Sequence, residues 1–298
     1  MIRLGLCCKF NEEPIKFRTA TATHLLTLTP AARAEKLAGI CRDNAAALRA
    51  ALDFCSANGI GSFRVNSQLL PLKTHPRAGY DLKALPGGTA TVSAFKACGR
   101  RAKSLGLRLT FHPDQFVLLS SPAAGVTNAS LLELEYQAEA AEWTGADVIN
   151  IHGGGAYGDK PAALRRLAAA LKRLSRRARA RLALENDDRT YSPADLLPFC
   201  REHALPFVYD VHHHRCLPDG LTVEEATRQA LATWGAREPL FHLSSPRDGW
   251  KGSDPRPHHD YIDIKDFPAC WRKLSITIEV EAKAKETAIA RLRKDLSI

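Results

Sequence analysis

The stretch Phe207-Val208-Tyr209-Asp210-Val211-His212-His213-His214 is an apolar run that ends in a carboxylate and three imidazoles. Its length and its aromatic and β-branched residues predict a buried strand whose polar end lies at the rim of a sheet. Carboxylate oxygens and imidazole nitrogens together can bind a divalent cation. A strand followed by a polar turn explains the same residues, so the metal interpretation depends on how the other strands end.

Seven further segments are strand-like, and a helical pattern follows each of the eight strands. The predicted strands are residues 2–8, 62–66, 108–111, 148–151, 181–184, 206–211, 240–243 and 276–280. The predicted helices are residues 31–58, 91–105, 129–143, 161–179, 193–203, 223–234, 260–274 and 283–294, with a long loop at 11–29. This alternation, without a composition break, predicts an α/β fold, a single (β/α)8 TIM barrel over residues 1–298. A doubly wound open sheet is the alternative, but the glycine-rich fingerprint that often follows its first strand is absent.

Composition and charge narrow the class of protein. The chain has 298 residues, 45% of them hydrophobic, and can bury a large core. The formal net charge is +10 and the sequence pI about 9.3, which favours a polyanionic partner because Lys and Arg release counterions from phosphates. The eight cysteines are scattered without a C-x-x-C pair, and no apolar run has the length of a membrane span. We therefore expect reduced thiols and a cytoplasmic protein.

The neighbouring strands also end in side chains that can bind metals. The carboxyl ends of the strands of a TIM barrel meet at one mouth, where its chemistry takes place. The third to eighth strands end in His112, His152, Glu185, Asp210 with His212 to His214, His242 and Glu281, and His258, His259 and Asp260 follow the seventh strand. Several carboxylates in one basin need cations or protons to coexist. The joint pattern predicts more than one divalent ion, Zn²⁺ or Mn²⁺ rather than Mg²⁺, which prefers oxygen and water.

Eight ordered blocks of the sequence resemble one known family. The blocks are Phe63-Arg64-Val65-Asn66-Ser67, His112-Pro113-Asp114-Gln115-Phe116, His152-Gly153-Gly154, Glu185-Asn186-Asp187-Asp188, Asp210-Val211-His212-His213, His242-Leu243-Ser244, His258-His259-Asp260-Tyr261-Ile262 and Glu281-Ala282-Lys283. Across nearly the whole chain they resemble the UV damage endonucleases. The resemblance implies a TIM-barrel DNA repair enzyme related to endonuclease IV. Such enzymes cut DNA on the 5′ side of ultraviolet photoproducts, and some also at abasic sites, with divalent metals, usually manganese.

The resemblance also implies a set of ligands. It assigns His112 and His152 to one metal, and Glu185 and Glu281 to bridging or completing neighbouring metals. The other implied ligands are Asp210, His213, His242 and His258, with His212 and His214 as alternatives to His213 and with Asp260 as a weaker candidate. We therefore expect two or three Mn²⁺ ions, with Zn²⁺ or Co²⁺ as alternatives, and Glu185, Glu281 and His242 as the catalytic residues. Metal ions can activate water and neutralise a leaving oxygen, so no protein nucleophile is required.

Other residues are candidates for contacts with damaged duplex DNA. Gln115 and Phe116, just beyond the third strand, lie where the family has a Gln-Tyr wedge. A poorly stacked photoproduct is easier to extrude than normal bases, and inserted side chains can hold the duplex bent. The alternative for Phe116 is packing under its loop. Residues in loops over the strand ends, among them Asn11, Arg189 and Lys251, are further candidate contacts.

Three positions depart from the family pattern. Leu6 and Phe116 stand at places where the family has Tyr, and Leu240 replaces a Lys that is carboxylated in some members to bridge metals. Losing this Lys bears on the number and identity of the metals. Glu279 is an added carboxylate on the same strand face as Glu281, and it either compensates in part for the lost Lys or pairs with Arg64.

Two other functions are open on the sequence alone. A metal-dependent sugar isomerase or epimerase uses Glu, Asp and His on the same barrel, but the number of imidazoles, the basic charge and the Gln-Phe pair favour the nuclease. A damaged-DNA-binding homologue that has lost catalysis fits the missing Tyr and Lys, but not the other retained ligands. On the preferred interpretation the protein is a monomer, its partner is double-stranded DNA with photoproducts, and it acts at a bacterial-type nucleoid.

Overall fold

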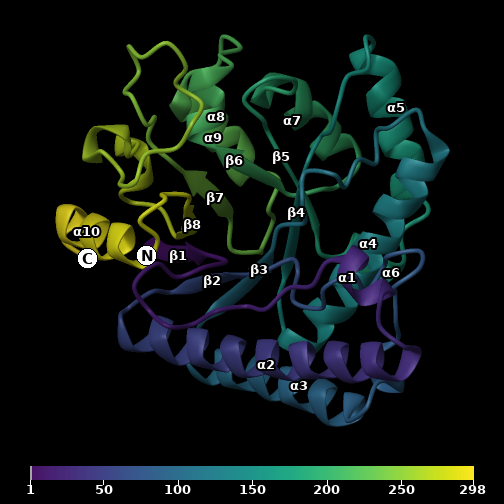
Figure 1. Cartoon of the computed structure of the whole chain (residues 1–298). Coiled ribbons are helices and arrows are strands. Elements are labelled where there is room, and N and C mark those ends of the chain that lie inside the picture. The colour runs from purple at the N-terminus through teal and green to yellow at the C-terminus, as the bar shows by residue number, and fades with distance from the viewer. Residues whose placement is uncertain (1) are drawn as a thin grey trace.

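A closed parallel barrel forms the centre of the molecule (Figure 1). The computed structural model describes residues 2–298. The strands are β1 (Ile2–Cys7), β2 (Ser62–Val65), β3 (Arg108–Phe111), β4 (Val148–His152), β5 (Leu182–Glu185), β6 (Phe207–Asp210), β7 (Leu240–Leu243) and β8 (Ile276–Val280). They are neighbours in sequence order, and β1 also pairs with β8, which closes the sheet. The predicted (β/α)8 barrel is confirmed, and the open sheet is excluded.

Helices and short turns connect the strands on the outside. The helices are α1 (Ala22–Leu26), α2 (Pro30–Ala57), α3 (Gly88–Ser104), α4 (Ala124–Thr144), α5 (Lys160–Leu171), α6 (Arg176–Arg179), α7 (Pro193–Glu202), α8 (Val211–Cys216), α9 (Val223–Leu231) and α10 (Glu286–Leu296). Three 3-10 turns are η1 (Leu82–Ala84), η2 (Ile264–Asp266) and η3 (Ala269–Trp271). Figure 1 shows the long helices α2 and α3 side by side along the flank that carries β2 and β3.

Two predicted helices and one predicted loop differ from the structure, and the strand predicted at 206–211 ends at Asp210, where the unpredicted helix α8 follows. The helix predicted at residues 260–274 is wrong, because this segment forms only η2 and η3, and Pro268, which lacks an N–H group, separates them. The helix predicted at 161–179 is split, since Ser175 starts α6 as a new N-cap and accepts a hydrogen bond from the Ala178 N–H. The loop predicted at 11–29 contains α1, which Thr21 caps.

Alternate residues of each strand face the helices and the barrel interior. The outward residues, such as Phe63, Ile149 and Tyr209, belong to the main hydrophobic core together with apolar residues of the helices. A second cluster consists of Val148, Ala183, Val208 and Leu240, packed with Trp234. We call this cluster the apolar floor. Two residues further along the same four strands lie Asn150, Glu185, Asp210 and His242, so a polar layer lies directly above the floor.

Two expectations about the chain as a whole can be compared with the structure. All eight cysteines are free thiols, as the spacing predicted. Between residues 2 and 298, the structure contains no helix with the length and apolar character needed to cross a membrane.

Candidate metal centre

The start of helix α8 places Asp210 and His213 together. Asp210 ends β6, and its Oδ1 atom accepts a hydrogen bond of 2.8 Å from the backbone N–H of His213, so it caps α8. The first turn of the helix brings Nδ1 of His213 to 3.5 Å from Oδ2 of Asp210. That oxygen is buried and has no hydrogen-bond partner among the described residues. A buried carboxylate oxygen without a partner is costly, and a bound cation would satisfy it.

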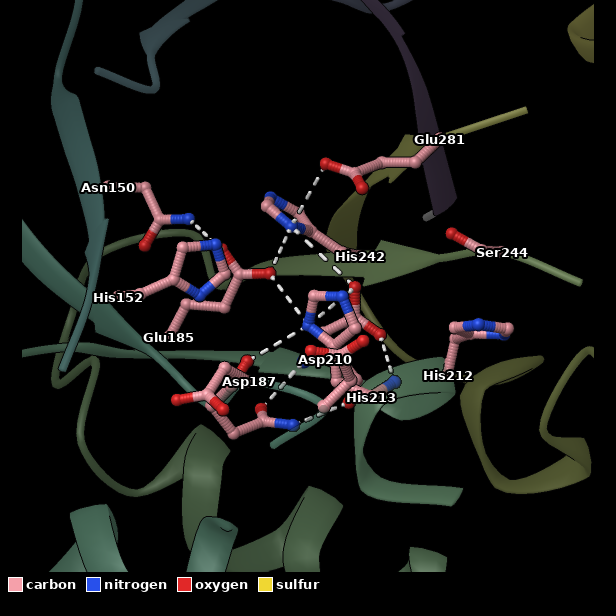
Figure 2. A network of polar contacts seen from close by, with 12 residues as sticks. Asn150, His152, Glu185, Asp187, Asp210, His212, His213, His242, Ser244 and Glu281 are labelled. Carbon is pink, nitrogen blue, oxygen red and sulfur yellow. Dashed lines mark hydrogen bonds and ion pairs between the residues drawn. The ribbon is translucent and has the colours of Figure 1, made fainter. Parts of the chain in front are cut away.

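Glu185, at the end of β5, lies at the centre of the cluster (Figure 2). Its side chain is 1% exposed. Its two oxygens lie within 4 Å of ring nitrogens of four histidines: His112 at 3.0 Å, His152 at 3.9 Å, His213 at 3.6 Å and His242 at 2.8 Å. One carboxylate therefore joins histidines from β4, β7, α8 and the loop after β3.

Three groups of residues are each arranged to hold one cation. In each group, one ligand atom per residue lies within 4.8 Å of the others. The groups are His112, His152 and Glu185; Glu185, Asp210 and His213; and Asp210, His242 and Glu281. Glu185 and Asp210 each belong to two groups, so neighbouring cations would share a carboxylate. The mixture of imidazole and carboxylate donors fits divalent ions such as Mn²⁺ and Zn²⁺.

The cluster perturbs the pKa values of its own members. Burial alone would raise the pKa of the Glu185 carboxyl, but His242, His152 and His112 hold it well below its ordinary range. Burial would lower the pKa of His213, but Asp210 and Glu185 outweigh it and raise that pKa to about 9. Burial lowers the pKa of His152. The Glu185 carboxylate is thus ionised, and a cation would compete with imidazole protons for its oxygens.

The other candidate histidines lie outside the three groups. Nδ1 of His258 is 3.7 Å from a carboxylate oxygen of Glu281, so His258 borders the cluster, and its role as a ligand remains a prediction. His212 stands apart in Figure 2, with its ring against those of His258 and Trp250. Asp260, the weaker candidate, is likewise absent from the three groups.

His214 has a structural partnership instead. Its ring is 2.7 Å from the hydroxyl of Tyr209 and 3.0 Å from a carboxylate oxygen of Asp219. Asp219 also accepts hydrogen bonds from the backbone N–H groups of Ala194 and Leu221. This network ties α8 to the start of α7 and so supports the position of His213.

Asp219→Asn is expected to destabilise the protein by about 1–3 kcal/mol at neutral pH, because a charged acceptor is lost. Burial alone would raise the pKa of Asp219, but the hydrogen bonds from Ala194, Leu221 and His214 outweigh it and lower that pKa. Since the folded pKa lies below the unfolded one, this stabilisation is complete above about pH 4 and is lost as the pH falls through the folded pKa. Urea unfolding should show a constant difference from wild type between about pH 7 and pH 5 that shrinks below about pH 4. A difference that grows on acidification would contradict the assignment.

The residues that depart from the family pattern lie in different parts of the barrel. Glu279 forms an ion pair with Arg64, and Arg64 also lies 2.6 Å from Glu281, so pairing with Arg64 is the role the structure shows. Leu240 belongs to the apolar floor, one layer below His242. Leu6 is fully buried in the main core and faces the helices.

Two asparagines support the cluster and were not predicted. Nδ2 of Asn150 donates a hydrogen bond of 2.5 Å to Glu185. Asn186 bonds to both the N–H and the carbonyl of Asp210, and its own carbonyl lies 3.0 Å from Nδ1 of His213. Asn150 lies two residues before His152 on the same strand face, so strand alternation could have identified it.

The loop after β3 exposes one large aromatic side chain. Phe116 is 73% exposed, whereas Val117 and Leu119 are buried. Packing under the loop therefore describes Val117 and Leu119, and it is wrong for Phe116. Phe116 borders a cavity of about 450 Å³ whose lining includes Lys73 and Glu133. Gln115 is also exposed and precedes Phe116 on the surface of the loop.

The remaining candidate DNA contacts lie on exposed loops. The side chain of Arg189 is 67% exposed and lies 3.8 Å from Asp188, and Lys251 is exposed in the loop after β7. Asn11 is exposed, but its amide donates to the carbonyl of Lys283, and its backbone N–H bonds to the carboxylate of Glu286. The structure thus gives Arg189 and Lys251 more freedom to contact DNA than Asn11.

A closed barrel that gathers buried carboxylates and imidazoles at the carboxyl ends of its strands defines a barrel enzyme with a centre suited to divalent cations. A family profile described as UV-endonuclease UvdE matches residues 2–298. A protein of Deinococcus radiodurans described as UV DNA damage endonuclease is 36% identical over 307 residues, covering 98% of this chain and 94% of the relative. The chain belongs to the UV-endonuclease UvdE family and is a DNA repair endonuclease.

Solved structures are similar in fold. The structure of SacUVDE matches with a TM-score of 0.87 at 24% sequence identity, covering 100% of this chain and 99% of the other. Endonuclease IV from Thermus thermophilus matches with a TM-score of 0.61 at 19% identity, covering 84% of this chain and 94% of the other. Both are similar to this chain in fold, which is the barrel whose strand ends meet at one mouth.

Proposed function

We propose that this enzyme cuts one strand of duplex DNA on the 5′ side of ultraviolet photoproducts and at abasic sites, using two or three divalent ions, foremost Mn²⁺. The observation that carries the proposal is Glu185, whose oxygens contact four histidines and which two of the three cation-competent groups share. The proposed ligands are His112, His152, Glu185, Asp210, His213, His242, His258 and Glu281. The enzyme would act as a monomer on the DNA of the nucleoid.

Each part of the centre has a distinct task in this proposal. Bound divalent ions would supply an activated water and neutralise charge on the scissile phosphate. Glu185 and Asp210, which each belong to two of the groups, would hold ions in both. Arg64 orients Glu281 through its contact of 2.6 Å. The apolar floor excludes water from the side of the centre opposite the mouth, which strengthens the electrostatic interactions above it.

The proposal is tested by incubating the protein and Mn²⁺ with an end-labelled duplex that carries one defined photoproduct. We expect a single cut at the phosphate on the 5′ side of the lesion, and none in the undamaged duplex. A separate duplex with one abasic site tests the second substrate. Cutting at other positions would contradict the proposed specificity, and interconversion of sugars without a nick would favour the epimerase.

Phe116→Ala is expected to weaken the preference for damaged over undamaged duplex by about 10-fold, because stacking of an aromatic side chain on a base contributes roughly 1–3 kcal/mol. The melting temperature should be unchanged, since Phe116 is exposed. Competition binding with and without the lesion measures the effect. Leu132→Ala, at an exposed position of α4, is the matched control and should keep the preference. Equal preference in wild type and Phe116→Ala would exclude the wedge.

A further inference from the structure

Glu279 is a buried carboxylate next to the proposed ligands that belongs to none of the three cation-competent groups. It faces the barrel interior on β8, is 1% exposed, and pairs in register with His242 of β7. Three donors surround its carboxylate: the guanidinium of Arg64, with Nε at 2.5 Å, the hydroxyl of Thr110, and Nε2 of His242 at 3.1 Å. Each of these three partners can therefore donate a hydrogen bond to the Glu279 carboxylate.

The two ring nitrogens of His242 face different surroundings. Nδ1 lies 2.8 Å from Glu185, 3.5 Å from Glu281 and 4.0 Å from Asp210, so it points at the proposed cations. Nε2 points away from them and lies near Glu279 and a guanidinium nitrogen of Arg64, the latter at 2.9 Å. A neutral imidazole carries one proton, and the nitrogen without it is the one that can bind a metal. Which tautomer forms thus decides whether Nδ1 can be a ligand.

Arg64 and Glu279 favour opposite tautomers. Arg64 can only donate hydrogen bonds, so its contact with Nε2 would leave the ring proton on Nδ1, where it would block a metal. An ionised Glu279 can only accept, so it holds the proton on Nε2. Glu279 also occupies Nε and Nη2 of Arg64, while Nη1 of Arg64 contacts Glu281. Nη2 of Arg64 thus lies against both Glu279 and the ring, and Glu279 competes with Nε2 for this donor as well as accepting from the ring.

We infer that Glu279 is a positioning residue for the metal centre, which holds His242 with its proton on Nε2 and leaves Nδ1 available as a ligand. The inference rests on the proposed metal centre and adds a residue that binds no metal itself. Carboxylates that fix the tautomer of a ligating histidine typically contribute about 10- to 100-fold to metal affinity.

The first test compares Mn²⁺ affinity, measured from free Mn²⁺ by electron paramagnetic resonance, in wild type and Glu279→Met. We expect affinity about 10- to 100-fold weaker in the variant, because Met is of similar length but offers no strong acceptor. Glu279→Gln should stay closer to wild type, since Arg64 and Nε2 of His242 both donate and would orient the amide oxygen toward them. If Glu279→Gln and Glu279→Met lost Mn²⁺ affinity equally, the charge of Glu279 would matter and not the tautomer of His242. This result would overturn the inference.

Glu238→Met is the matched control. Glu238 precedes β7 at the opposite end of the barrel and, like Glu279, accepts hydrogen bonds from an arginine and a threonine, here Arg3 and Thr277, but has no histidine partner among the described residues. Its substitution should leave Mn²⁺ affinity unchanged. If wild type binds Mn²⁺ and a folded Glu279→Met binds it equally well, this inference fails and the metal centre stands. If wild type binds no Mn²⁺, the metal centre itself is wrong.

A second measurement needs no substitution at Glu279. In the Zn²⁺-loaded wild type, ¹⁵N NMR of the histidine rings should show His242 protonated on Nε2 and metal-bound through Nδ1, with the signal assigned by its absence in His242→Ala. A proton on Nδ1 of His242 would overturn the inference even if Glu279→Met failed to fold.

Discussion

Glu185→Gln is expected to slow the incision of a photoproduct-containing duplex by at least about 10³-fold, while duplex affinity stays close to that of wild type. The substitution keeps the shape of the side chain and removes the charge that two cation-competent groups share. Loss of about 4 kcal/mol of transition-state stabilisation corresponds to this factor, and it is within the range that metal-ion catalysis supplies. The loop residues proposed to contact DNA are untouched, so binding should persist.

Single-turnover incision and gel-shift binding on the same labelled duplex measure the two effects separately. Glu238→Gln is the control, because it makes the same chemical change at the opposite end of the barrel and should cut at the wild-type rate. A Glu185→Gln protein that had normal metal content and cut irradiated duplex at the normal rate would show that Glu185 is not part of the catalytic centre.

Removal of divalent metals is expected to abolish incision and lower the melting temperature, and added Mn²⁺ should reverse both effects. Glu279 and Glu281 contact the guanidinium of Arg64, and Glu185 and Asp210 lie within 4.0 Å of the ring of His242, so four carboxylates gather in one region. A cation relieves their repulsion, and a ligand at about 100 times its dissociation constant stabilises a folded protein by about 2.7 kcal/mol.

After chelator treatment, metal analysis gives the metal content, calorimetry gives the melting temperature, and the incision assay gives the activity. The stabilisation by Mn²⁺ should be smaller in Glu185→Gln, which would link the melting temperature to this centre rather than to cations bound at the surface. Full incision by a protein shown to contain no divalent metal would refute the metal mechanism.

The barrel and the inward direction of most candidate residues could be predicted because both follow from short periodic patterns. Strand alternation together with polar strand ends identified His152, Glu185 and His242 before any contact was known. His213 was different. Strand alternation continued beyond Asp210 places His212, not His213, on the same face as Asp210, and only the family resemblance selects His213. The structure explains why, since α8 begins directly after Asp210, and a helix of six residues is too short to show a helical pattern in the sequence.

Contacts between distant strands could not be predicted from such patterns. The sequence left two roles open for Glu279, and its approach to His242 depends on the register of β7 against β8. The segment 260–274 has apolar residues at nearly helical spacing, yet it forms only two 3-10 turns, with Phe267 and Trp271 buried. The spacing of its apolar residues therefore predicted a helix where the chain forms 3-10 turns.

The pairing of β1 with β8 determines when the barrel can close during synthesis of the chain. The first strand, Ile2–Cys7, finds its second partner only in Ile276–Val280, and the proposed ligand Glu281 is the next residue along the chain. During synthesis, the barrel can therefore close only after β8 has left the ribosome, and contacts of such long sequence separation form late. The barrel closes as the proposed ligand Glu281 reaches the centre, so a chain that stops before β8 would have no assembled centre.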